Sequence, residues 1–227
     1  LGFQPDAIAE VYQTLNASRN ISQPIVLTSH FACADDLDSS ATLKQIDIFK
    51  ACAPVTALQS LANSAAILAW PKAKREWQRP GYMLYGNSPF SVAQENADQL
   101  KPVMSFESAV ISLRQIAAGE SVGYTANWTA ERDSTIATIT VGYGDGYPRH
   151  APNGTPVLVN GVRCPLAGRV SMDMITVDVT ALAEVAIGDK AVLWGPALPV
   201  NEVAQYCGTI GYELLTRMPA RVPRSYI

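Results

Sequence analysis

GYGDGYPRHAPNGTPVLVNGVRCPLAGRVSMDMI, residues 142–175, is the stretch that most directly indicates the fold of this chain. Asn160-Gly161 stands between the apolar run 157–159 and Val162, which is the pattern of a hairpin closed by a two-residue type I′ turn. Upstream, glycines that permit backbone bends alternate with the side chains of Tyr143, Asp145 and Tyr147. The stretch predicts β structure with functional groups at its turns, although a glycine-rich β scaffold without function has a similar composition.

The β pattern continues on both sides of this stretch. Runs rich in β-forming residues, separated by Gly, Pro and Asn turns, lie at 103–113, 135–143, 157–159, 174–179 and 191–194. Helical spacing returns only at 200–207 and 212–217. We therefore predict a mostly β domain over residues 96–227.

The first part of the chain has a different pattern, in which helices and strands alternate. Helices are predicted at 5–16, at 39–53 and at 65–70, and strands at 25–27, 56–61 and 81–84. Asn63 is placed to cap the third helix. Such alternation is typical of parallel α/β structure. The fold class is therefore α/β plus all-β, with domains at 1–95 and 96–227 and the boundary within 87–101.

Composition limits the kinds of partner. The 227 residues are 48% hydrophobic and carry a net charge of −3 without a cluster of Lys or Arg, so no nucleic acid or anionic membrane is expected as a partner. The apolar run at 64–71 is too short to span a bilayer. Nothing in the chain resembles a signal peptide. Because the chain opens at Leu1 rather than Met, we interpret it as a fragment of a longer protein.

The cysteines and histidines do not form a metal-binding pattern. The four cysteines at 33, 52, 164 and 207 are widely spaced, and His30 and His150 are the only histidines. We expect no metal site, unpaired thiols and a cytoplasmic location.

Three predicted strand ends carry polar residues that suit an anionic ligand. His30 ends the first strand, Ser64 follows the second at a helix N-terminus, and Arg79 precedes Gly81 and Tyr82. In β/α barrels, strand ends and backbone amides commonly hold phosphate groups. Ser64 with the amides of Gly81 and Tyr82 would form a phosphate cradle. Each residue also has an ordinary structural reading, with Ser64 as a helix cap, Arg79 as a surface cation and His30 as a core histidine.

Six segments in order and at matching spacing resemble the pyridoxal-phosphate-dependent alanine racemases. They are LTSHFACAD (27–35), LANSAAIL (61–68), RPGYMLYG (79–86), VGYTANW (122–128), GYGDGYPR (142–149) and GRVSMDM (168–174). The resemblance implies the C-terminal half of a (β/α)8 barrel followed by a mostly β domain. Of the family's G-M-x-R-L-G-F motif, only the closing LGF is present, at residues 1–3.

The family's chemistry implies roles for several residues. L-alanine and D-alanine would be interconverted as an imine with pyridoxal 5′-phosphate, by two bases on opposite faces of Cα. One base would be Tyr124, reaching the active site of the partner subunit in a homodimer. A phenol has an ordinary pKa near 10, so Arg149 would orient Tyr124 and favour its phenolate form.

The remaining matches concern the cofactor and the substrate. His30 would lie by the cofactor ring, and Arg79 would donate to its pyridine nitrogen and so weaken the ring as an electron sink. Ser64, the amides of Gly81 and Tyr82, and the Tyr212 hydroxyl would hold the phosphate. The substrate residues would be Met172, whose amide meets the substrate carboxylate, Asp173, and Tyr143, which narrows the entrance. Many family members have Cys at the position of Ser171.

The family's second base, a lysine that binds the cofactor, has no counterpart in this chain. Its A-V-x-K-A-N-A-Y-G-H-G motif would lie upstream, in the missing N-terminal barrel half, and no lysine here has that context. The chain alone is expected to be inactive. The alternatives are a broad-specificity racemase or a decarboxylase on the same architecture, and a non-enzymatic β-domain or cofactor-binding protein.

Overall fold

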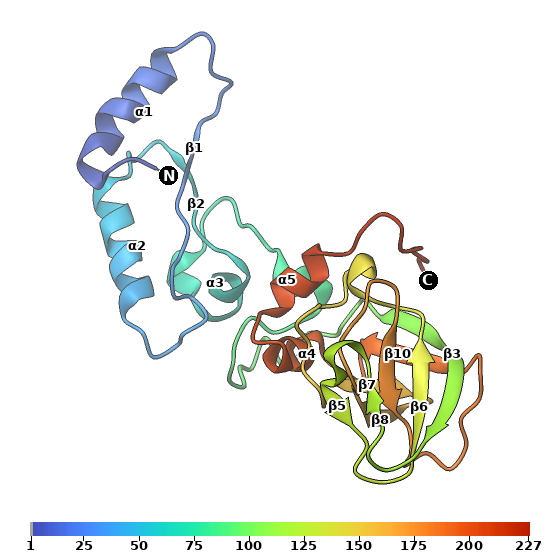
Figure 1. Ribbon diagram of the computed structural model, residues 1–227. Coiled ribbons are helices and arrows are strands. Elements are labelled where there is room, and N and C mark those ends of the chain that lie inside the picture. The colour runs from blue at the N-terminus through green and yellow to red at the C-terminus, as the bar shows by residue number, and fades with distance from the viewer. Residues whose placement is uncertain (1) are drawn as a thin grey trace. The chain divides into compact units, whose positions relative to one another are not determined.

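The computed structural model describes residues 2–227, so Leu1 of the LGF segment lies outside the described residues. The chain divides between Lys101 and Pro102 into two compact units (Figure 1). Among the described residues, no helix is long and apolar enough to cross a membrane.

The first unit has parallel α/β structure, as predicted. Its helices and strands are η1 (Pro5–Ala7, a 3-10 turn), α1 (Ile8–Ala17), β1 (Val26–Thr28), α2 (Ala41–Cys52), β2 (Leu58–Ser60), α3 (Ser64–Ala69) and the 3-10 turns η2 (Pro71–Ala73) and η3 (Tyr82–Tyr85). Strands β1 and β2 pair in parallel, from Val26 opposite Leu58 to Thr28 opposite Ser60, and α2 is the crossover between them. This β-α-β order confirms the predicted barrel-type half.

The predicted third strand at 81–84 is wrong, because that segment is the 3-10 turn η3. The extended neighbour of β2 comes earlier, where Trp77 bridges Ser60 in parallel and the Arg79 amide donates to the Ala62 carbonyl at 2.9 Å. Downstream, the Gly81 amide donates to the Ser64 hydroxyl instead of to a strand. A backbone donor that is already satisfied by a side chain cannot extend a sheet ladder.

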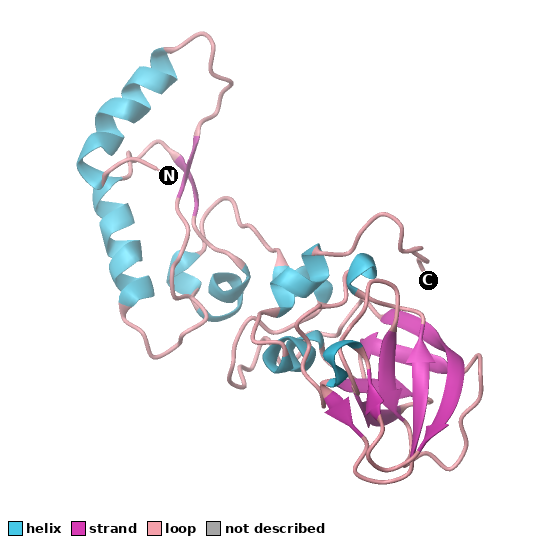
Figure 2. Cartoon of the chain, in the orientation of Figure 1, coloured by secondary structure: helices cyan, strands magenta, loops and turns pink. Residues whose placement is uncertain are grey.

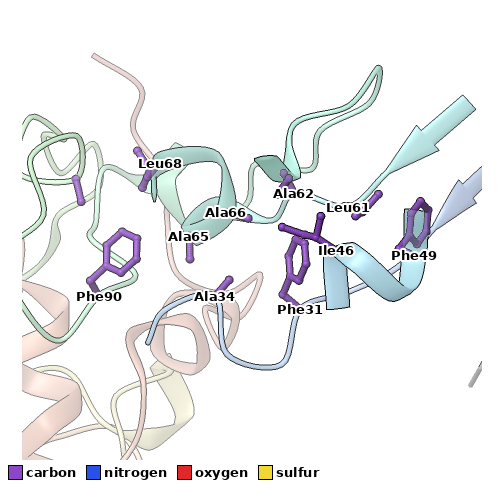
Figure 3. Close-up of a cluster of buried hydrophobic side chains, with 12 residues drawn as sticks. Phe31, Ala34, Ile46, Phe49, Leu61, Ala62, Ala65, Ala66, Leu68 and Phe90 are labelled. Carbon is purple, nitrogen blue, oxygen red and sulfur yellow. The ribbon is translucent and has the colours of Figure 1, made fainter. Parts of the chain in front are cut away.

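Apolar side chains from α2, α3 and the strand ends form the core of the first unit. Figure 3 shows part of this cluster, with Phe31 and Ile46 near Leu61 and Ala62. Leu61 and Ala62 are fully buried directly after β2. The core therefore fixes the point at which β2 ends and α3 begins.

The second unit is mostly β, as predicted. Its elements are β3 (Phe106–Ile116), β4 (Ser121–Val122), η4 (Tyr124–Ala126), β5 (Trp128–Thr129), β6 (Ser134–Ile139), η5 (Tyr143–Asp145), β7 (Pro156–Val159), β8 (Val162–Pro165), β9 (Ile175–Asp178), β10 (Lys190–Trp194), α4 (Val200–Tyr206) and α5 (Gly211–Thr216). The strands curve around one core, shown in magenta in Figure 2. The predicted strand at 135–143 ends earlier, at Ile139, and the chain turns at η5.

One curved sheet holds six of these strands in the order β8-β7-β10-β3-β6-β9. Leu166, directly after β8, bridges Val177 of β9, so the two edges of the sheet meet and it is nearly closed. The predicted hairpin is confirmed: Val159 pairs with Val162, and both Asn160 and Gly161 have the positive φ of a type I′ turn.

Candidate functional site

In the first unit, the Arg79 guanidinium lies across the carboxyl ends of β1 and β2. Its Nη1 donates to the Ser60 carbonyl at 2.8 Å and to the Ser60 hydroxyl at 2.7 Å, and its Nη2 donates to the Ser29 carbonyl at 2.7 Å. The Nδ1 of His30 is 3.4 Å from the same Nη2. Arg79 is therefore held in place by the strand ends, which excludes the reading as a loose surface cation.

One donor of this guanidinium is left over. Within residues 2–227 the Nε of Arg79 makes no hydrogen bond, although both terminal nitrogens do. His30 is exposed, so the reading as a packed core histidine is wrong. An N–H donor and an imidazole therefore stand at this end of the strands.

Ser64 lies beside the Gly81 segment, as the phosphate-cradle prediction requires. Its hydroxyl oxygen is buried and accepts the amides of Gly81 at 3.0 Å and Met83 at 3.2 Å. Helix α3 is capped by the Asn63 side chain, which accepts the Ala66 amide at 3.0 Å. Ser64 therefore does not cap the helix. Because its hydroxyl oxygen already accepts two amides, the Ser64 hydroxyl can interact with an anion by donating its proton.

These groups together suit a phosphorylated aromatic ring. The Ser64 hydroxyl and the Arg79 guanidinium lie at the carboxyl ends of parallel strands, beside the Gly81–Tyr82 backbone, and this is where anions bind in α/β structures. A Cβ built on Gly81 would meet no atom within 4 Å, so a ligand can approach this backbone closely. Tyr212 belongs to α5 of the second unit and is exposed.

In the second unit, Tyr124 projects from a strained turn. Its side chain is 66% exposed, and the next two residues, Thr125 and Ala126, have φ of 64° and 49°. Positive φ is uncommon for residues other than glycine, and such strain is concentrated at functional sites. A Cβ on Gly123 would lie 2.9 Å from the Arg169 amide nitrogen, so the VGYTANW turn lies directly against the GRVSMDM segment.

The GYGDGYPR and GRVSMDM segments are also in direct contact. The Tyr143 amide donates to the Ser171 carbonyl at 3.0 Å, and the Gly144 amide donates to the Met172 carbonyl at 2.8 Å. All three motifs of the second unit therefore meet in one region. Met172 and Asp173 are exposed there.

The two tyrosines of GYGDGYPR have different environments. Tyr147 is 1% exposed and stacks on Trp194 with 6.4 Å between ring centroids, and burial raises the pKa of its phenol. Tyr143 is exposed, and the Arg149 guanidinium carbon lies 5.8 Å above its ring centroid. Tyr147 therefore anchors the loop and Tyr143 faces outward. No hydrogen bond joins Arg149 to Tyr124 within residues 2–227, so the effect expected of Arg149 on Tyr124 stays a prediction.

Sequence reasoning missed Arg221, which links the same two segments. Its guanidinium bonds to Asp145 and to Asp173, residues 76 and 48 positions away in the chain. The only signal in the sequence was a pair of carboxylates at glycine-rich turns and an arginine in the tail, and no local spacing connects them.

We expect Gly142→Ala to force the two turns apart. A Cβ at this position would lie 2.3 Å from the Met172 carbonyl oxygen and 2.4 Å from that of Ser171. Overpacking against backbone cannot relax by a rotamer change, so the free energy of unfolding should fall by about 1–3 kcal/mol. Urea unfolding of the full-length protein measures it. Gly161→Asn is the control, because Gly161 faces open space and Asn tolerates its positive φ; equal stability of both variants would contradict the prediction.

The described residues contain no group of three or more His, Cys, Asp or Glu side chains that could hold a metal ion. The four cysteines are free thiols.

Two family models match the chain. The model described as the alanine racemase N-terminal domain covers residues 1–89, and that of the alanine racemase C-terminal domain covers residues 103–226. The boundary between the matches falls close to the division between the two compact units.

Individual relatives agree with this assignment. The chain is 50% identical to the alanine racemase of Vibrio cholerae, over 100% of this chain and 63% of the relative. The crystal structure of a biosynthetic alanine racemase from Pseudomonas aeruginosa matches 100% of this chain and 63% of its own, with 49% identity and a TM-score of 0.93. A Bartonella henselae alanine racemase with covalently bound pyridoxal phosphate matches 98% of this chain and 60% of its own, with 36% identity and a TM-score of 0.85. The chain thus spans slightly less than two thirds of these relatives.

Proposed function

This chain belongs to the alanine racemase family, and from that premise we propose that the full-length protein interconverts L-alanine and D-alanine with pyridoxal 5′-phosphate as cofactor. The observation that carries the proposal is the Arg79 guanidinium, fixed at the ends of β1 and β2 with its Nε unpaired in residues 2–227. A non-enzymatic protein with the same fold would not need a donor that is fixed in place in this way.

The first unit supplies the cofactor-binding residues of this proposal except Tyr212, which belongs to α5 of the second unit. Ser64, the amides of Gly81 and Tyr82, and the Tyr212 hydroxyl would hold the phosphate, with the Gly81 amide exchanging its bond to the Ser64 hydroxyl for one to the ligand. Arg79 would donate to the ring nitrogen, with His30 beside the ring. Pyridoxal phosphate, when bound, supplies the electron sink for the charge that remains on Cα when its proton is removed. An arginine at the ring nitrogen discourages its protonation, so the proton-transfer residues of the protein carry more of the catalysis.

The second unit supplies the proton-transfer and substrate residues. Tyr124 exchanges the proton on one face of Cα in the partner subunit's site, and a lysine upstream of residue 1 serves the opposite face. The exposure of Tyr124 and the strained turn that follows it support this role. A side chain that transfers a proton in another subunit has to project from its own subunit. Arg149 orients Tyr124. The Met172 amide binds the substrate carboxylate, Asp173 lies beside it, and Tyr143 narrows the entrance.

The assembly and cellular setting follow from the same proposal. The protein is a homodimer with active sites at the subunit interface, and residues 96–227 are the domain that reaches the partner's site. Four free thiols support a reducing cytoplasm as its location. The reaction then either provides D-alanine as a peptidoglycan precursor or breaks D-alanine down as a nutrient.

The test is a racemisation assay on the full-length protein. Purified protein with pyridoxal phosphate is given L-alanine, and D-alanine is measured by chiral chromatography, with the reverse reaction in parallel. We expect both directions to reach the same equimolar mixture. A panel with serine, lysine and arginine separates alanine specificity from a broad-specificity racemase, and absence of turnover on every amino acid would refute the enzymatic proposal.

A further inference from the structure

Arg221, in the tail that follows α5, joins two turns through one side chain. Its Nη2 lies 2.7 Å from Oδ1 of Asp173 and 2.8 Å from Oδ1 of Asp145, and its Nε donates to the same Asp145 oxygen at 2.9 Å. Asp145 belongs to η5 and Asp173 to the GRVSMDM segment. A single planar guanidinium therefore spans both turns.

Asp145 is committed on both of its oxygens. Oδ1 receives Arg221, and Oδ2 accepts the Gly142 amide at 2.9 Å. Since the amides of Tyr143 and Gly144 in this turn donate to the Ser171 and Met172 carbonyls, Asp145 connects Arg221 to the backbone ladder between the turns. Arg221 is thus linked through Asp145 to the turn whose amides donate to the Ser171 and Met172 carbonyls.

The guanidinium also packs closely on the turn. A Cβ built on Gly144 would lie 2.4 Å from Nη2 of Arg221, so glycine is what allows this approach. The hydrogen bonds that Arg221 donates to Asp173 and to Asp145 raise the pKa of its guanidinium, which keeps it charged. An exposed ion pair contributes little to stability, so the consequence of this contact is geometric. A lysine offers a point charge without the fork that reaches two carboxylates.

We infer that Arg221 is a positioning residue that clamps the 142–145 turn to the 171–173 turn and holds the Met172 amide where the substrate carboxylate binds. The inference rests on the proposed function for its kinetic consequence, but the clamp itself concerns only residues of the second unit.

The kinetic test uses Arg221→Met in the full-length protein with pyridoxal phosphate. Because the Met172 amide binds the carboxylate equally in the ground and transition states, KM for alanine should rise about 5- to 20-fold while kcat changes less than about 3-fold. Arg132→Met is the matched control, since it removes the same charge from an exposed residue with one 3.6 Å contact to Asp178. In Arg221→Lys, KM should rise less than in Arg221→Met but should stay above the wild-type value.

The second readout does not depend on activity. Amide hydrogen exchange of the substrate-free protein should be faster at Tyr143 and Gly144 in Arg221→Met and unchanged in Arg132→Met. If Arg221→Met does not fold, Asp173→Ala removes one arm of the clamp and should accelerate exchange at Gly144 alone. Unchanged exchange in these variants would overturn the clamp. If the wild-type protein shows no racemisation, the proposed function fails while the exchange result still decides the clamp.

Discussion

Tyr124→Phe in the full-length protein is expected to lower kcat for alanine racemisation about 10²- to 10⁴-fold, the range that a positioned acid/base group supplies. The phenyl ring is retained, and within residues 2–227 the Tyr124 hydroxyl makes no hydrogen bond whose loss would destabilise the fold. The effect should therefore appear in catalysis and leave the melting temperature unchanged. Steady-state kinetics in both directions measures it.

Isotope exchange sharpens this test. With two bases on opposite faces, loss of Tyr124 leaves the other base working, so exchange of the α-hydrogen in D₂O should persist for one alanine enantiomer and nearly vanish for the other. Tyr206→Phe is the control, because Tyr206 is an exposed tyrosine on α4 of the same unit. Racemisation by Tyr124→Phe at a rate near that of wild type would show that this phenol is not the base.

Residues 1–227 on their own are expected to produce no D-alanine above the uncatalysed background, a larger loss than any single substitution. The reason is chemical, since no lysine of the chain has the context of the cofactor-binding residue in the family. The Vibrio cholerae relative also extends over sequence that this chain does not contain, since the match covers 63% of that relative.

The comparison has three samples. Each sample is assayed with pyridoxal phosphate and L-alanine. The samples are residues 1–227 alone, residues 1–227 mixed with the separately expressed upstream segment, and the full-length protein. Activity is expected in the full-length protein and, at a lower level, in the mixture. Turnover by residues 1–227 alone would contradict the need for an upstream lysine.

Local signals in the sequence were sufficient for most of the fold. Asn63 and the Asn160-Gly161 pair act through backbone atoms within three residues, and the structure has the predicted cap and hairpin at both places. The third strand of the first unit was misplaced, because β-like composition at 81–84 was outweighed by a distant hydroxyl. Ser64 is 17 and 19 positions away from the amides of Gly81 and Met83 that it accepts.

The sequence by itself determined the two kinds of unit, the motifs and the residue types at the site, because propensity, capping and turn chemistry act over a few neighbouring residues. Only the tertiary structure decided that Arg79 is fixed by two strand ends, that Tyr147 is buried while Tyr143 faces out, and that Arg221 joins Asp145 to Asp173. Those contacts form only when the core brings together segments dozens of residues apart, and local sequence patterns do not predict such long-range contacts.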